Sequence, residues 1–324
     1  MTGLRKNKMK KIIAPVVIVF MLLIAGVFIG CSLSKIGYKK ISSAEDLLAI
    51  SSNVDGKYIL TEDIDMSGYE WTPLVFGGVL DGNGHKITNL SVSSTGESMR
   101  TTIDGNRKEY ETEFSGMFDV LSGEVRNLEL SDLVVEVQSD QPCFAGGLAG
   151  YLENGTVNNC KISGTVTLNA HDRMFGVGGI CGAGYGTIKD SCIDVVLICI
   201  DTDSDTKDEQ FMGGVCAVGY PDIINCNVII DGYDSEHGYA HNGGLMGMYI
   251  YEKDVVLDGQ ITGNTVTGQI TFFEDNDDRR AYCNWYIGEV MSVILGKSTN
   301  EEYFVSNEVF EYDIVLLPPE NLVD

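Results

Sequence analysis

Hydrophobic residues along most of the chain fall in short runs of about five to seven residues, separated by glycine, asparagine and aspartate. Runs of this length are typical of β-strands and are too short for the periodic face of a helix. Gly-Gly pairs followed by such runs recur roughly every 30 residues through the middle of the chain. The last four pairs are Gly146-Gly147, Gly178-Gly179, Gly213-Gly214 and Gly243-Gly244. A repeat of this length with three short strands predicts one coil of a solenoid.

A second motif follows most of these pairs and places asparagine before an apolar residue, as in VNNCKI and IINCNV. Stacked coils put equivalent residues in columns about 4.8 Å apart. Asparagine suits a bend in such a coil, because it tolerates left-handed backbone angles and its amide can bond to the next coil. The expected bend column is Asn89, Asn127, Asn159, Ser191 and Asn225, and the expected interior column beside it is Leu90, Leu128, Cys160, Cys192 and Cys226.

The stretch GGLAGYLENGTVNNCKISGTV closely resembles the GLUG repeat of bacterial surface proteins, and the resemblance covers roughly residues 41–270. It implies a right-handed parallel β-helix on a bacterial surface and says little about activity. Some larger relatives are peptidases, whose activity lies in other domains. We therefore predict an all-β fold, a right-handed parallel β-helix (a solenoid) of about six coils with a short N-terminal capping helix.

The two ends of a solenoid need caps against edge pairing. In SSAEDLLAIS, Ser42 and Glu45 have the spacing of a capping box, and Leu47, Leu48 and Ile50 give an apolar face. We expect the β-helix over residues 41–270, followed by a final irregular coil and C-terminal cap over residues 271–324.

Residues 1–31 have the pattern of an export signal, with a basic start and an uncharged run over residues 12–30. The run ends in Phe28-Ile29-Gly30-Cys31, which resembles the lipobox of bacterial lipoproteins and implies lipidation of Cys31. The alternative is an uncleaved membrane anchor, since about 19 apolar residues can just span a bilayer. Both interpretations make the membrane a partner and place residues 32 onward, beginning with a linker over 32–40, outside the cytoplasm.

The charge balance narrows the classes of partner. The chain carries 22 basic and 47 acidic residues, a formal net charge of −25, so we expect no binding to nucleic acid. Such a surface favours cations and neutral or basic partners. Because 44% of the residues are hydrophobic, the chain can still bury a core.

Most glycine-rich and cysteine-rich features have structural explanations. FGGVLDGNGHKITNL lacks the spacing of a phosphate-binding loop, and its Asp-Gly and Asn-Gly pairs are turn signals. Nine cysteines in an exported chain suggest disulfides. However, Cys181 and Cys216 share a column with Ala149 and Met246, as small buried hydrophobic residues do, so we expect free thiols.

Acidic runs at residues 201–205 and 274–278 and one histidine pair could bind a metal ion. Asp201, Asp203 and Asp205 alternate like the start of a calcium loop, but Thr206 replaces its glycine and Met212 its glutamate, so a solvated loop is the alternative. His237 and His241 have the spacing of zinc ligands on a helix without the accompanying glutamate, and we interpret them as loop or strand-edge residues. Calcium is therefore the one cofactor that the sequence suggests.

The long insertions, roughly 93–113, 201–211, 232–241 and 273–281, fall at the same point of each coil. Stacking would gather them along one edge, where we expect the ligand-binding residues Tyr110, Tyr233, Tyr239 and Phe273. The predicted function is a non-catalytic, membrane-tethered binding or adhesion module for a glycan or an extracellular protein. The alternative is a β-helix polysaccharide lyase or glycoside hydrolase, but no repeated carboxylate column identifies catalytic residues.

Overall fold

The computed structural model describes residues 37–96, 98–101, 110–170, 174–201, 209–234, 239–250, 260–273, 286–288, 291–295 and 308–317. The chain divides into two units, Met1–Lys39 and Lys40–Asp324. Only residues 37–39 of the first unit are described, so the predicted export signal and Cys31 lie outside the described residues. Within the described part of the chain, no helix is long and apolar enough to cross a membrane.

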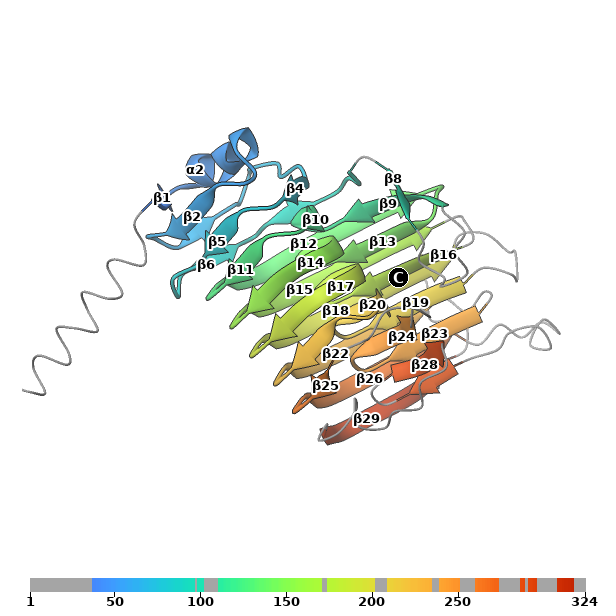
Figure 1. Cartoon of the computed structure of the whole chain (residues 1–324). Coiled ribbons are helices and arrows are strands. Elements are labelled where there is room, and N and C mark those ends of the chain that lie inside the picture. Colours follow the sequence, from blue (N-terminus) through green and yellow to red (C-terminus); the bar gives the residue numbers. More distant parts are fainter. Residues whose placement is uncertain are drawn as a thin grey trace, which may run out of the picture. The chain divides into compact units, whose positions relative to one another are not determined.

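Three sheets build the second unit, and consecutive coils contribute parallel strands to each of them (Figure 1). We call the thirteen-stranded sheet "sheet 1", the nine-stranded sheet "sheet 2" and the seven-stranded sheet "sheet 3". A coil begins in sheet 3, continues in sheet 1 and ends in sheet 2. The chain is therefore an all-β parallel β-helix, which confirms the predicted fold class.

Six coils pass through all three sheets, judged by the six parallel strands of sheet 3 that the structure describes. The first comprises β9 (Tyr110–Ser115), β10 (Phe118–Leu121), β11 (Glu124–Arg126) and β12 (Glu129–Ser139). The next two comprise β13 (Cys143–Gly146), β14 (Ala149–Asn158) and β15 (Lys161–Ala170), then β16 (Met174–Gly178), β17 (Cys181–Lys189) and β18 (Cys192–Asp201). The fourth coil comprises β19 (Glu209–Gly213), β20 (Cys216–Gly219), β21 (Asp222–Ile224) and β22 (Asn227–Asp234). The fifth comprises β23 (Tyr239–Gly243), β24 (Met246–Ile250), β25 (Ile261–Thr262) and β26 (Thr265–Phe273). The sixth comprises β27 (Tyr286–Gly288), β28 (Met291–Leu295) and β29 (Glu308–Leu317).

Shorter elements precede these coils. They are β1 (Lys39–Ile41), α2 (Ala44–Leu48), the 3-10 helix η1 (Ala49–Ser52), β2 (Lys57–Leu60), β3 (Ile64–Asp65), β4 (Leu74–Phe76), β5 (Val79–Asp81), β6 (Lys86–Thr88), β7 (Ser91–Val92) and β8 (Met99–Thr101). The predicted capping helix is present, but its capping box is displaced by one residue. The Ser43 hydroxyl accepts a hydrogen bond from the Asp46 backbone N–H at 3.2 Å, and the Asp46 carboxylate accepts one from the Ser42 backbone N–H at 2.9 Å.

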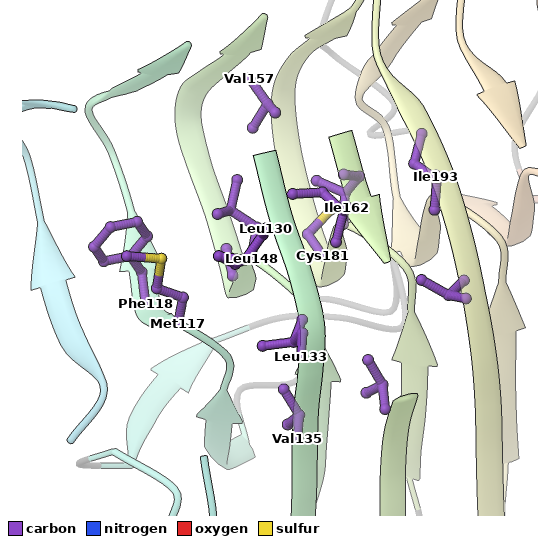
Figure 2. Close-up of a cluster of buried hydrophobic side chains, with 14 of the residues drawn as sticks. Met117, Phe118, Leu130, Leu133, Val135, Leu148, Val157, Ile162, Cys181 and Ile193 are labelled. Atoms are coloured by element: carbon purple, nitrogen blue, oxygen red, sulfur yellow. The ribbon is translucent and has the colours of Figure 1, made fainter. Parts of the chain in front are cut away.

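Aliphatic columns fill the interior of the coils (Figure 2). One column in sheet 1 joins Leu80, Val125, Val157, Ile188, Ile223 and Ile261 through successive register pairs, and all six side chains are buried. Burial of each such side chain contributes roughly 1.5–3 kcal/mol relative to exposure. Phe76 and Phe118 stack at a centroid distance of 4.7 Å near the N-terminal end of this core.

The Gly-Gly pairs mark the corner between sheets 3 and 1, where backbones approach closely. A Cβ atom at Gly178 would overlap the carbonyl oxygen of Cys181, and Gly146 and Gly213 are equally close to the corresponding carbonyls of their own coils. Any larger residue would force the two strands apart, so the fold accounts for the recurrence of glycine at this corner.

Asparagine occupies the corner between sheets 1 and 2, as predicted, with one correction. Asn159 has a φ of 53° and Asp190, not Ser191, takes the same left-handed position in the next coil with a φ of 52°. A short carboxylate side chain tolerates this conformation almost as asparagine does. Ser191 therefore points inward opposite Cys160, whose backbone N–H donates to the Ser191 hydroxyl at 3.1 Å. Cys192 consequently leaves the predicted interior column and lies, half-buried, on the outward side of β18 between Lys161 and Asn227.

Single extra residues are absorbed by β-bulges within the strands. The pairing of β12 with β15 shifts between Leu130 and Leu133, where Asp132 has a φ of 54°. The pairing of β14 with β17 shifts between Glu153 and Gly155, where Asn154 has a φ of 55°. Pairing resumes in register beyond each bulge.

Candidate binding edge at the loop corner

The chain passes from sheet 2 to sheet 3 at one corner of every coil, which we call the loop corner. Strand ends lie in register there: Ala170 pairs with Asp201 at the end of sheet 2, and Met174 pairs with Glu209 at the start of sheet 3. Glu209 in turn pairs with Tyr239. The connections between these strands therefore start and finish along one edge of the β-helix. Their own residues, 171–173, 202–208, 235–238 and 274–285, lie outside the described residues.

The strands extend further into the predicted insertions than the sequence suggested. Tyr110 already begins β9, Tyr239 begins β23, and β26 continues to Phe273. The expected boundaries at residues 113, 211, 232 and 241 are therefore wrong, because residues there continue the backbone pairing of neighbouring strands. The expected boundary at 281 lies outside the described residues.

The predicted ligand-binding residues all belong to strand ends at the loop corner, but only one of their side chains is described. Tyr233 lies one residue before the end of β22 and is half-buried on the outward side of sheet 2. Its hydroxyl donates to the Asp231 carboxylate at 3.0 Å. Burial, and then the hydrogen bond to Asp231, raise the pKa of Tyr233, so its hydroxyl stays protonated at neutral pH. The side chains of Tyr110, Tyr239 and Phe273 lie outside the described residues.

The predicted calcium ligands are only partly described. Asp201 ends β18 and is 5% exposed, whereas Asp203 and Asp205 lie outside the described residues. Among the residues that the structure describes, no group of three or more histidine, cysteine, aspartate or glutamate side chains could hold a metal ion. The calcium site therefore stays a prediction.

Buried polar residues that the sequence analysis missed also gather at the loop corner. Asp234 and Asn242 are both 0% exposed, and the Asn242 amide donates to the Asp234 carboxylate at 2.6 Å. The preceding coils have apolar side chains at these positions: Cys199 pairs with Asp234, and Met212 pairs with Asn242. A polar residue at an inward position of an alternating strand is the signal that could have revealed Asp234.

Further buried or partly buried polar residues lie near Asp234 at the loop corner. Ser139, at the end of β12, donates to the Glu113 carboxylate at 2.8 Å, and Gln210 is fully buried in β19. Asp201 and Asp234 belong to adjacent strands of sheet 2 and point to the same inward side. Carboxylates and amides in such a poorly solvated position make strong hydrogen bonds to donors that reach them.

A hollow at the asparagine corner is a weaker candidate. It has a volume of about 140 Å³ and is lined by Gly84, Asn127, Leu128, Glu129, Asn159 and Lys161. The Asn159 amide donates to the Asn127 side-chain oxygen at 2.8 Å, and the Lys161 ammonium lies 3.5 Å from the Glu129 carboxylate. These groups already bond to one another, which leaves few of them available to a ligand.

Aromatic side chains form a second column on the outward side of sheet 3. Phe114, Phe144 and Phe211 pack there with Ala183, Val218 and Met248 of sheet 1, and His241 pairs with Phe211 in the next coil. His241 stacks on Phe211 at a centroid distance of 5.0 Å and is 5% exposed. Burial lowers the pKa of His241 to about 4, so the ring is neutral at pH 7. His241 is thus a buried packing residue within β23, while His237 lies outside the described residues.

Known proteins resemble this chain in part of its sequence and in its fold. No family model matches the chain. Halomucin of Haloquadratum walsbyi is 30% identical over 160 residues, a match that covers 43% of this chain and 2% of halomucin. A Bacteroides ovatus protein described as a candidate immunoglobulin A1 protease superposes with a TM-score of 0.51 and 18% identity, covering 88% of this chain and 85% of that one. An IgA1 protease superposes with a TM-score of 0.58 and 14% identity, covering 86% of this chain and 20% of that one.

These matches support the fold class of the chain, but they do not identify the protein. Both solved structures are less than 25% identical to this chain, so they show the fold alone. The chain spans a small fraction of halomucin and a fifth of the larger protease. It is, by fold, a parallel β-helix protein.

Proposed function

We propose that this chain is a non-catalytic binding or adhesion module of the bacterial cell surface, with the GLUG-type repeats that its sequence resembles. Residues 1–31 would tether it, either through a lipid on Cys31 or as a membrane helix. The ligand would be a glycan or an extracellular protein. The observation that carries the proposal is the register at the loop corner, which brings the ends of successive connections to one edge.

The loop corner suits recognition because a rigid scaffold holds variable segments in a fixed order. Tyrosine and phenylalanine at strand ends, among carboxylates, offer flat apolar faces and hydrogen-bond acceptors to sugars or basic peptides. The similarity to halomucin and to proteins named for immunoglobulin A1, which occurs outside bacterial cells, supports a location facing other cells or secretions.

The binding proposal is tested with residues 32–324, checked first for a cooperative thermal transition and then applied to arrays of glycans and extracellular proteins. We expect at least one specific ligand and a loss of affinity of about tenfold in Tyr233→Ala. Ile229→Ala is the matched control, because Ile229 is 41% exposed on the same strand at a distance from the loop corner. Equal binding by both variants would remove Tyr233 from the site, and a blank array would count against the adhesion role.

Calcium and the membrane tether have separate tests. If Asp201, Asp203 and Asp205 hold calcium, a chelator lowers the thermal midpoint, and Asp203→Asn with Asp205→Asn abolishes that effect.

If Cys31 is lipidated, cells expressing Cys31→Ala release or mislocalise the chain, and the chain lacks the added mass of the lipid. An unchanged membrane fraction without a lipid mass would favour the uncleaved anchor.

The alternative is a glycan-degrading enzyme, and one observation favours it. Asp201 and Asp234 are inward-facing carboxylates on adjacent strands beside the loop corner. Polysaccharide cleavage requires a pair of carboxylates that the substrate can reach, so the loop corner would have to open to expose Asp201, which is 5% exposed, and Asp234, which is 0% exposed. Turnover of a polysaccharide that Asp234→Asn abolishes and Asp194→Asn leaves intact would establish this alternative, since Asp194 is exposed on the outward side of β18.

A further inference from the structure

Among the cysteines that the structure describes, one pair lies in direct register across neighbouring strands. Cys181 of β17 pairs with Cys216 of β20, and both side chains are fully buried on the inward side of sheet 1. Every cysteine that the structure describes carries a free thiol. The other described cysteines face different residue types across the ladder: Cys143 pairs with Phe175, and Cys199 with Leu168 and Asp234. Cys160 and Cys226 belong to one column, but Ser191 separates them.

The pair meets the main-chain condition for a disulfide. Directly paired residues of neighbouring parallel strands have Cα atoms about 4.8 Å apart, within the roughly 4.4–6.8 Å range of disulfides. Inward side chains at such positions point in the same direction, and the two thiols are in hydrogen-bond contact. A disulfide also needs Cβ atoms about 3.5–4.5 Å apart, so the two strands must draw slightly closer for the bond to form.

We propose that Cys181 and Cys216 form a disulfide that joins two consecutive coils when the chain folds under oxidising conditions. The two thiols each lose a proton, and together they lose two electrons to the disulfide of a small-molecule or protein oxidant. The oxidant's S–S bond breaks and yields two thiols, while one S–S bond forms in the chain through a mixed disulfide. The proposed location outside the cytoplasm would supply such an oxidant.

The bond forms during folding rather than afterwards. In the folded chain no oxidant can approach these thiols without opening the coil, because both are fully buried. The contact with Cys216 and burial also raise the pKa of Cys181 well above its ordinary value, so the attacking thiolate is scarce in the folded state. Once formed, the bond closes one coil and reduces the conformational freedom of the unfolded chain.

The test uses the full chain, refolded from guanidinium with oxidised glutathione or with a reductant, and mapped by mass spectrometry after digestion. We expect a linked pair of peptides containing Cys181 and Cys216 after oxidative refolding. We also expect a thermal midpoint higher by on the order of 5–10 °C than that of the reduced chain. Folded, reduced chain treated with the same oxidant should form the link at least tenfold more slowly.

Matched variants separate this bond from general effects of oxidation. Cys181→Ala should fold, because Ala149 occupies the same column one coil earlier, and should lose the redox-dependent shift. Cys160→Ala removes an equally buried thiol and should keep both the link and the shift. Alkylation of both Cys181 and Cys216 after oxidative refolding of the unmodified chain would overturn the proposal even if a variant does not fold. A bond between Cys143 and Cys199 instead would also overturn it. Neither of these two overturning outcomes tests the proposal that the loop corner binds a ligand.

Discussion

At the residue scale, left-handed backbone angles at the asparagine corner determine where each coil bends from sheet 1 into sheet 2. Asn127, Asn159 and Asn225 have φ values of 51°, 53° and 54°. Their amides also join coils: Asn127 donates to Asp81 at 3.0 Å, and Asn225 donates to Asp190 at 3.2 Å. Each residue therefore contributes both a conformation and a hydrogen bond, and the two contributions can be separated.

Substitutions at Asn159 separate the contribution of the left-handed conformation from that of the side-chain hydrogen bond. Asn159→Ala removes the amide bond to Asn127 and places a Cβ-bearing residue without a local hydrogen bond at positive φ. It should lower the free energy of unfolding by about 2 kcal/mol, roughly half from each contribution. Asn159→Gly keeps the conformation and should cost about 1 kcal/mol. Denaturant unfolding measures both, and equal losses would show that conformation contributes nothing.

Cys192 provides a residue-scale test of the corrected register. Its thiol lies on the outward side of β18, whereas burial raises the pKa of Cys160 to about 11 and that of Cys226 to about 12. A water-soluble thiol reagent at pH 8 should therefore label Cys192 at least tenfold faster than either buried thiol. Peptide mapping of the native protein gives the rates. Faster labelling of Cys160 than of Cys192 would mean that Cys192 points inward, as the sequence motif predicts.

At the element scale, the aromatic column on β9, β13, β19 and β23 links stability to pH through His241. The folded-state pKa of His241 is about 4, below its ordinary value of 6.5, so the unfolded chain binds more protons between these pH values. The stability contributed by the neutral ring is complete above about pH 6.5 and is lost as pH falls toward 4. The loss should approach about 2–3 kcal/mol.

His241→Phe tests this contribution, because phenylalanine already occupies the same column at Phe114, Phe144 and Phe211. The variant should remove most of the fall in stability between pH 6.5 and pH 4 and change little at pH 8. The comparison is made by denaturant unfolding at several pH values. If the free energy of unfolding falls equally with pH in both proteins, groups other than His241 cause the acid sensitivity.

The strands β8 and β9 allow a test of the predicted first insertion. They pair antiparallel, and Thr101 lies opposite Tyr110 at the ends of the described strands. A two-residue Asn-Gly turn can therefore replace residues 102–109. The thermal midpoint should change by less than about 3 °C, because no described core residue is removed. A loss of ligand binding with an unchanged midpoint would place recognition in this segment, and a collapse of the transition would make the segment structural.

At the scale of the whole molecule, the excess of acidic residues opposes the compact state. With a formal net charge of −25, like charges on neighbouring coils repel one another, and salt screens that repulsion. Raising sodium chloride from about 10 mM to about 300 mM should therefore raise the thermal midpoint by a few degrees. Choline chloride is the control for a specific sodium effect. A falling midpoint would mean that ion pairs outweigh the repulsion.

Much of the fold could be predicted because its repeats are visible in the sequence, whereas the site could not. The Gly-Gly spacing and the asparagine motif are local signals, and they located the corners and most of the columns. The sequence motif assigns Cys192 to the wrong column, because the Ser-Cys pair in KDSCID resembles the Asn-Cys motif. Only the backbone pairing of Asn158 with Lys189 fixes the register. Asp234 and Asn242 meet across two sheets, and no local pattern reports such a contact.

The bulges at Asp132 and Asn154 affect how the sequence of such a chain can gain or lose residues during evolution. A residue gained or lost in one coil would otherwise turn every later side chain of the strand to the opposite face. Here the extra residue leaves the ladder at a left-handed position, and pairing continues unbroken from Leu133 to Ser139. Changes in coil length therefore remain local, so individual coils can acquire insertions while the following coils keep their hydrophobic faces inside.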